Sequence, residues 1–227
     1  MNVMSLFRTL FRSSGLAGLA ILVSCGNSVS LDPARRAEAS KIRVERQVAR
    51  PEKLSYTDAG AAAAAMPLAI TGGLVGGLAG GAIAEGMNAD NRDELERMIT
   101  GTVGDAGKPL REAMAAALKR KKCATVTETG AKSRLALEYT TLGLMPLQTF
   151  SSEMQIIMEV EATLTANDGT VIWRTNSGSY PHNDQLPVRT MDEYRAQPAL
   201  FGQDLEATCA WVADSLADYL KWEMVDE

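Results

Sequence analysis

Apolar and polar side chains alternate along one long stretch of this chain, from Met154 to Thr165. Successive side chains of a β-strand point to opposite faces, so the alternation predicts a long strand with one buried face. The sequence Asn167-Asp168-Gly169 follows at once and is typical of a hairpin turn. The chain therefore returns along Thr170–Ser179, and this antiparallel pair constrains the rest of the fold.

The remaining segments indicate a domain of two layers. Helix-type and strand-type segments are grouped along the chain, which is typical of the α+β class. We expect an α+β, two-layer domain, with an antiparallel sheet of about four to five strands packed by two helices, preceded by a Gly/Ala-rich apolar helix. The other expected strands are Lys41–Val48, Cys123–Thr129 and Arg134–Leu142, and the expected helices are Pro109–Lys122 and Gly202–Trp222.

The most unusual segment is Pro67–Ala84, which has no charged residue and carries six regularly spaced glycines. Residues four apart stack on one face of a helix, so these glycines would form a stripe against which another backbone can pack closely. This zipper helix either contacts a membrane or packs against protein, whether its own domain, a partner or other copies of the chain. Its helix-packing face consists of Gly72, Gly73, Gly76, Gly77, Gly80 and Gly81.

The N-terminus has the pattern of an export signal. Arg8 and Arg12 precede a short apolar run, which predicts a signal peptide. The order Leu22-Val23-Ser24-Cys25 resembles the lipobox of bacterial lipoproteins, and this resemblance implies cleavage before Cys25 and its acylation. An ordinary signal peptide or a signal anchor is the alternative. By the same resemblance, Gly26 in place of Asp favours the periplasmic face of the outer membrane.

These patterns divide the chain into four parts. The predicted parts are a lipoprotein signal peptide at 1-24, a lipidated tether and short strand at 25-58, a Gly/Ala-rich zipper helix at 59-87, and an α+β periplasmic domain at 88-227.

Charge and cysteine content narrow the partners and the chemistry. The net charge of −5 argues against nucleic acid as a partner, because nucleic-acid binding needs a basic footprint. An oxidising compartment permits a disulfide between Cys123 and Cys209. Counting four crossings of the sheet places Cys123 and the start of the last helix at the same end, which makes the bridge possible. Two buried free thiols are the alternative.

The run from Pro109 to Lys221 resembles small domains of proteobacterial envelope lipoproteins. The features that carry the resemblance are a helix with a basic last turn, the strand Cys123–Thr129, the hairpin sequence A-N-D-G-T-V-I-W and an amphipathic last helix. The similar families are the auxiliary lipoproteins of ABC-type transport systems and the curli-export lipoprotein. The resemblance contains no catalytic signature. The glycine run separately looks like the glycine-zipper segments of other outer-membrane lipoproteins.

The sequence offers few residues for catalysis. His182 is the only histidine and falls in an expected loop, without a Ser or Cys nucleophile motif. Glu159 and Glu161 share the polar face of a strand, where solvated carboxylates are more common than an acid pair. No metal-binding motif is present in the sequence. We therefore predict no enzyme activity, no metal and no cofactor.

Two further groups have a plain interpretation and a functional one. Lys119–Lys122 form either a solvated helix end or a site for a phosphate or a lipid headgroup. Trp211 and Trp222 either pack the last helix on the sheet or form an interface or membrane contact.

Two functions fit these features. The first is a membrane-anchored periplasmic binding or structural lipoprotein that presents its α+β domain to envelope partners. The alternative is a subunit of an outer-membrane export or transport assembly that oligomerises through the glycine zipper. In both cases the membrane is bound through acylated Cys25, and a protein partner or another copy packs on the Gly72–Gly81 face. A hydrolase is a third hypothesis, which the lack of a nucleophile motif disfavours.

Overall fold

The structure is a computed structural model that describes residues 28–51, 54–56, 89–148 and 151–225. The signal peptide, Cys25 and the glycine segment 57–88 lie outside the described residues. The strands are β1 (Lys41–Ala49), β2 (Ser55–Tyr56), β3 (Thr125–Val126), β4 (Ser133–Pro146), β5 (Glu153–Ala166), β6 (Val171–Ser179) and β7 (Arg189–Thr190). The helices are the 3-10 helix η1 (Pro33–Arg35), α2 (Arg36–Ala39), α4 (Ala89–Met98), the π-helix η4 (Ile99–Val103), α5 (Gly107–Lys121), α6 (Met191–Ala196) and α7 (Ala199–Met224).

All described strands belong to one sheet, with the order β3-β1-β4-β5-β6. The short strand β2 pairs with β4, and β7 pairs with β5. The three long strands β4, β5 and β6 form an antiparallel meander, as the alternation and the hairpin sequence predicted. Gly169, in the β5–β6 turn, has a φ of 86°, a left-handed conformation that glycine adopts without strain.

The predicted fold class is wrong. The sheet is mixed and has seven strands, whereas four to five antiparallel strands packed by two helices were expected. Strand β1 is parallel to β3 and β4, and β2 is parallel to β4. The reason is the connection: the chain leaves β1 and returns to β4 only after α4 and α5, and such a long crossover brings the next strand back in a parallel direction. The short helices α2 and α6 were not expected either.

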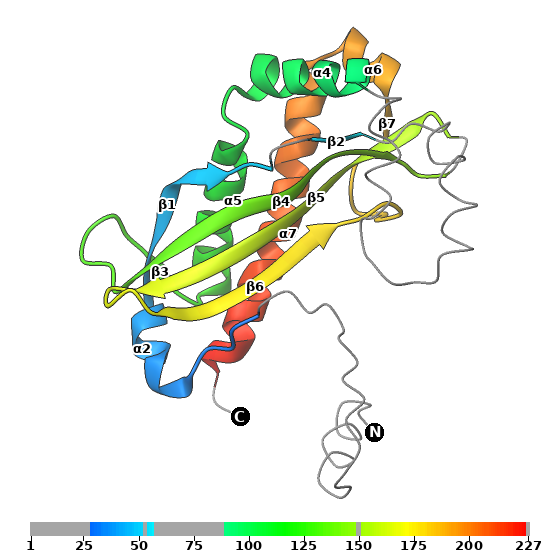
Figure 1. The fold of residues 1–227 in the computed structure, drawn as a ribbon. Coiled ribbons are helices and arrows are strands. Elements are labelled where there is room, and N and C mark those ends of the chain that lie inside the picture. The colour runs from blue at the N-terminus through cyan, green and yellow to red at the C-terminus, as the bar shows by residue number, and fades with distance from the viewer. Residues whose placement is uncertain (1–27, 52–53, 57–88, 149–150, 226–227) are drawn as a thin grey trace, which may run out of the picture.

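The core lies between the sheet and helices α5 and α7, which cover one of its faces (Figure 1). From Val160 onward β5 buries every second residue, as the alternation predicted. Near its start both faces of β5 are buried, because Gln155 donates to the carbonyls of Asn183 and Leu186, 2.8 and 3.2 Å away, in the loop that covers that face. The fully buried side chains that join the layers include Leu110, Met114, Leu118, Leu135, Trp173, Leu205, Val212 and Leu216.

The domain is elongated and its two ends are built from different elements (Figure 1). One end, called here the α2 end, contains α2, the β5–β6 turn and the last turns of α5 and α7. The opposite end, called the α4 end, contains α4, α6, β2 and β7. Helix α7 runs from the α4 end to the α2 end, and its 26 residues span about 39 Å at 1.5 Å per residue. Among the helices of the described residues, none is both long and apolar enough to cross a membrane.

Close packing of β2 on β4 depends on Gly143. A Cβ atom at this position would lie 1.7 Å from the carbonyl oxygen of Ser55. We expect Gly143→Ala to lower the free energy of unfolding by about 1–3 kcal/mol, because the backbone of β2 must move away. Urea unfolding measures this change.

Gly101→Ala is the matched control, since a Cβ at Gly101 meets no atom within 4 Å. Equal unfolding free energies for the two variants would contradict the close approach of β2 to β4.

Candidate functional site

The N-terminal segment is fixed to the α2 end. Val29 forms a two-way backbone bridge with Arg174 on the free edge of β6, with both N–O distances 2.9 Å. Leu31 is buried, and its N–H donates to the carboxylate of Glu223 near the end of α7. The segment predicted to be a tether is therefore part of the folded domain from Ser28 onward.

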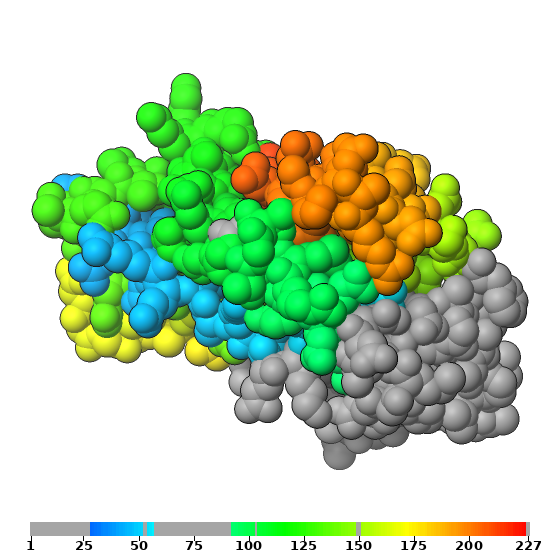
Figure 2. Space-filling model, turned by 90° about the horizontal axis from the view of Figure 1, so that it is seen from above, coloured from blue at the N-terminus to red at the C-terminus, as the bar shows by residue number. Residues whose placement is uncertain are grey.

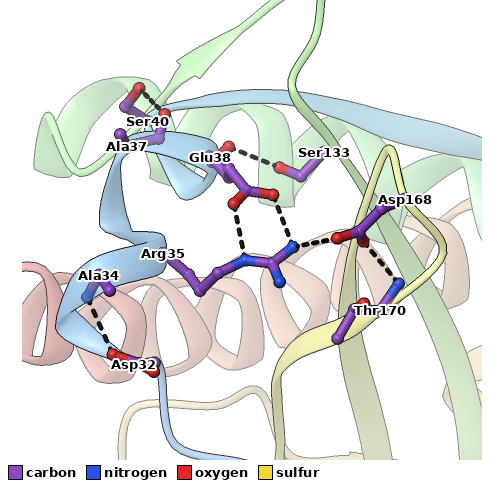
Figure 3. Close-up of polar contacts among 9 residues, drawn as sticks. All are labelled: Asp32, Ala34, Arg35, Ala37, Glu38, Ser40, Ser133, Asp168 and Thr170. Carbon is purple, nitrogen blue, oxygen red and sulfur yellow. Dashed lines mark hydrogen bonds and ion pairs between the residues drawn. The ribbon is translucent and has the colours of Figure 1, made fainter.

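Arg35 holds this segment against the β5–β6 turn (Figure 3). Its guanidinium lies 2.6 Å from Glu38 and 2.8 Å from Asp168. Asp168 also accepts a hydrogen bond from the backbone N–H of Thr170 at 2.9 Å, and this bond together with Arg35 lowers the pKa of Asp168. The backbone carbonyl of Glu38 in turn accepts from the hydroxyl of Ser133 at 3.0 Å, which joins α2 to the start of β4.

Arg36 ties the same segment to the C-terminal end of α7. Its guanidinium donates to the backbone carbonyl of Glu223 at 2.8 Å and to that of Val225 at 3.1 Å. Cys25 stands four positions before Val29. Because an extended residue spans at most about 3.3–3.6 Å, Cys25 lies within about 14 Å of the β6 edge.

Apolar side chains are exposed beside this attachment. On the last turns of α7, Tyr219 is 47% exposed and Trp222 is 69% exposed, and Val225, just after the helix, is 57% exposed. Packing of Trp222 on the sheet, the plainer of the two interpretations, is therefore wrong. Trp211, one of the other tryptophans of the chain, is partly buried and donates its indole N–H to Gln185 at 3.2 Å.

A groove of about 750 Å³ opens between the end of α5 and the edge strand β3. Lys119 and Lys122 are exposed at its rim, whereas Arg120 and Lys121 make ion pairs with Asp214 and Asp218 on α7. The groove has positive charge but no carboxylate or histidine in its lining, so it offers no general base. It is lined by Ser40, Ala115, Ala116, Lys119, Lys122, Cys123, Ala124, Thr125 and Val126.

Both described thiols are free and buried. The Cys209 Sγ atom lies 3.4 Å from the hydroxyl oxygen of Tyr139, near the start of α5, whereas Cys123 lies at the end of α5 close to Asp218 and Lys221. From Cys209 to Asp218 the helix rises about 13 Å, and a disulfide needs Cα atoms within about 7 Å.

The bridge between Cys123 and Cys209 is therefore not made, and free thiols, the alternative left open by the sequence, are present instead. The crossing count failed because β3 has two residues and does not cross the sheet. The chain returns to the α2 end before β4 begins, so the last helix starts at the opposite end from Cys123.

Alkylation distinguishes free from bridged thiols. Burial raises the pKa of both cysteines, that of Cys209 to about 12, so little reactive thiolate forms near neutral pH. We expect iodoacetamide to leave both thiols unmodified in the folded protein and to alkylate both in denaturant without a reductant. Peptide mass spectrometry reads the result. Alkylation in denaturant that requires prior reduction would show a disulfide instead.

The other polar candidates lie apart from one another. His182 is exposed in a turn, with a φ of 72°. Glu159 accepts from Asn176 at 3.0 Å, and Glu161 lies 3.5 Å from Arg174, so each carboxylate has its own cross-strand partner and the two form no acid pair. Within the described residues, no three His, Cys, Asp or Glu side chains gather to hold a metal ion.

A buried carboxylate lies at the α4 end, and its contacts indicate a structural role. Asp204 accepts from Tyr194 at 3.2 Å and from Arg189 at 3.3 Å, which joins β7 and α6 to the first turns of α7. Burial raises the pKa of Asp204, while Arg189 opposes this rise. The hydroxyl of Tyr194 has a raised pKa as well, mainly through burial, so it remains a hydrogen-bond donor.

The flanks of the glycine segment both lie at the α4 end. Before the segment, Ser55 and Tyr56 of β2 pair with Gly143 and Leu144 of β4. After it, α4 begins, and Arg195 of α6 binds both oxygens of Glu94 at 2.8 Å. Figure 2 looks onto this end, where α4 lies beside α6 and the start of α7. Segment 57–88 therefore leaves and rejoins the domain at the end opposite the attached N-terminus.

Comparison with known proteins assigns no family to this chain. No protein-family model matches the sequence. No curated protein matches it.

Several solved structures show a distant likeness. Protein XCC0632 from Xanthomonas campestris, of the family model DUF330, is 15% identical over 50% of this chain and 60% of that one, with a TM-score of 0.35. A dodecamer of a PelC point variant from Paraburkholderia phytofirmans is 11% identical over 85% and 92%, with a TM-score of 0.30. Lipoprotein GNA1162 from Neisseria meningitidis is 13% identical over 72% and 96%, with a TM-score of 0.25.

This chain spans 60% of the length of the Xanthomonas protein. At TM-scores below 0.5, these likenesses carry no argument about this chain.

Sequence reasoning missed the residues that fix the N-terminal segment. Asp32-Pro33 is the one signal that was available: Asp is a favoured N-cap, and proline is favoured at the first helical position. The structure has this arrangement, with the Asp32 side chain accepting from the N–H of Ala34 at 2.9 Å. Glu38, one partner of Arg35, is only three residues away. Asp168, its other partner, and Glu223, which binds Arg36, are more than a hundred residues away, and no local pattern indicates them.

Proposed function

We propose that this protein is a lipoprotein of the outer membrane, anchored on the periplasmic face through acylated Cys25, with a binding or structural role and no catalysis. The domain stands with its α2 end toward the membrane. Its α4 end holds the glycine segment away from the membrane, where the Gly72–Gly81 face packs against a protein. The observation that carries this proposal is the placement of the attached N-terminus and of the glycine-segment flanks at opposite ends.

The N-terminal attachment sets the orientation. If Cys25 carries acyl chains, the bilayer lies within about 14 Å of the β6 edge. The α4 end is then separated from that bilayer by the length of the domain, about 39 Å along α7. Half of segment 57–88, as a helix, would span about 24 Å and would not reach back to the membrane. This geometry favours protein packing over contact with the anchoring bilayer.

The chemistry of the described residues supports a role without catalysis. The groove beside α5 is lined by lysines and by the buried Cys123, whose pKa is raised. The buried Asp204 is bound by Arg189 and Tyr194. Catalysis by acid and base groups needs titratable side chains that meet at one place. In the described ranges, His182, Glu159 and Glu161 do not meet.

Self-association is the second candidate. The six glycines fall into two registers four residues apart, so an identical stripe on another copy would allow two backbones to approach closely. In this case the protein forms part of an envelope export or transport assembly. The cross-linking experiment described below distinguishes self-association from packing against a different protein.

Removal of the acylated thiol tests the anchor. We expect wild-type protein in the outer-membrane fraction and most of Cys25→Ser in the soluble periplasmic fraction, because the acyl chains on Cys25 are the proposed covalent anchor. Fractionation followed by immunoblotting measures the distribution. Retention of Cys25→Ser in the membrane at the wild-type level would overturn lipid anchoring as the means of attachment.

Cross-linking tests the glycine face. We expect Gly72→Cys and Gly76→Cys to give disulfide-linked or short-linker adducts in membranes, because a backbone packed on the stripe brings a partner within reach. Adducts of twice the subunit mass indicate self-association, and adducts of other masses indicate a different protein. The control is Gly101→Cys, where a new side chain has free space. Monomer alone from both stripe variants, or equal adducts from the control, would overturn the role of the stripe.

A further inference from the structure

We propose that the C-terminal end of α7 rests on the lipid surface through Tyr219 and Trp222 of its last two turns and Val225 just after the helix, called here the α7-end patch. This inference rests on the proposed anchoring at Cys25 and adds a second, noncovalent contact to the bilayer. In this proposal the exposed side chains of the patch contact the headgroups and the upper acyl chains of phospholipids.

The patch concentrates the exposed apolar surface of the described residues. Four large hydrophobic side chains are strongly exposed in that part of the chain, and three of them belong to the patch, the fourth being Tyr180 at 62%. Tyr219 and Trp222 are three positions apart, so they share one face of the helix. Tyrosine and tryptophan have an apolar ring with a polar tip and are enriched where a membrane meets water.

The chain outside the structure ends beside this patch. The described residues begin at Ser28, and the N–H of Leu31 donates to Glu223, the neighbour of Trp222 in sequence. Cys25 is six positions before Leu31, so the acylated residue lies within about 20 Å of the end of α7. An anchor this short brings the α7-end patch to the level of the headgroups.

Exposed lysines lie at this end of the domain, and the carboxylate of Glu223 beside Trp222 accepts from the N–H of Leu31. Lys221 is exposed on the same helical turn, and its charge reaches Cys123 at the end of α5, where Lys119 and Lys122 are also exposed. The acidic residues Asp214 and Asp218 on this part of α7 are paired with Arg120 and Lys121. Lysines close to an anionic lipid surface are attracted to it, which favours the same orientation.

Quenching of tryptophan fluorescence by brominated lipids tests the contact. Full-length protein is purified from membranes and reconstituted into phosphatidylethanolamine–phosphatidylglycerol vesicles whose acyl chains carry bromine. We expect quenching of the wild-type protein and loss of most of it in Trp222→Phe, because Trp173 is buried and Trp211 lies about 16 Å further along the helix. Phenylalanine keeps an apolar ring on the bilayer while it removes the indole signal.

Tyr180→Trp in the Trp222→Phe background is the matched control. It places an exposed indole just after the end of β6, whose last residue Ser179 pairs with Met158 in the middle of β5. This position is eight residues of β5, about 26 Å, from Ala166 at the β5–β6 turn of the α2 end, and we expect it not to restore quenching. Equal quenching of wild type and Trp222→Phe, or its restoration by Tyr180→Trp, would overturn the contact. Shielding of Trp222 from aqueous iodide without quenching by brominated lipid would assign the patch to a protein interface and overturn it as well.

Mass spectrometry of the same sample separates this contact from the proposed anchor. Acylated Cys25 with no quenching at Trp222 overturns the contact alone. Unmodified Cys25 with no quenching overturns both. Unmodified Cys25 with quenching that depends on Trp222 retains the contact and overturns the anchor.

Discussion

The N-terminal segment is attached to the β6 edge and to the end of α7. This attachment determines how the domain can be oriented relative to anything bound upstream of Ser28. The attachment combines a two-way backbone bridge at Val29, a buried Leu31 and the guanidinium groups of Arg35 and Arg36. The individual ion pairs are partly exposed and each contributes little. Together with the backbone bridge, however, they leave no freely moving spacer from Ser28 onward, so an anchor upstream of this residue constrains orientation as well as position.

The topology of the sheet places the glycine segment at the end of the domain opposite the attached N-terminal segment. Because β1 and β4 are parallel, the crossover between them must begin and end at opposite ends of the sheet, and the chain travels back along α5. The glycine segment lies before that return, between β2 and α4, and so both of its flanks stay at the α4 end.

Sequence patterns predicted the parts of the fold that depend on local periodicity. The alternation in β5, the turn at Gly169 and the amphipathic faces of α5 and α7 are all encoded within single segments. The pairing of strands is not encoded within single segments. The two-residue strands β2, β3 and β7 show no periodicity, and their partners depend on where the chain returns to the sheet. The disulfide prediction failed for this reason, since one short strand counted as a full crossing reverses the end at which the last helix begins.

The same dependence on distant partners explains why the sequence left two interpretations of Trp222 open. Its helical spacing from Tyr219 is compatible with either a buried or an exposed face, because a helix of 26 residues extends past the sheet that covers its centre. Only the position of the N-terminal segment shows that this end of α7 is also the end nearest the proposed anchor at Cys25. A domain held within about 20 Å of a bilayer can bury that exposed indole among the headgroups. The proposed anchor and the exposed patch thus account for each other.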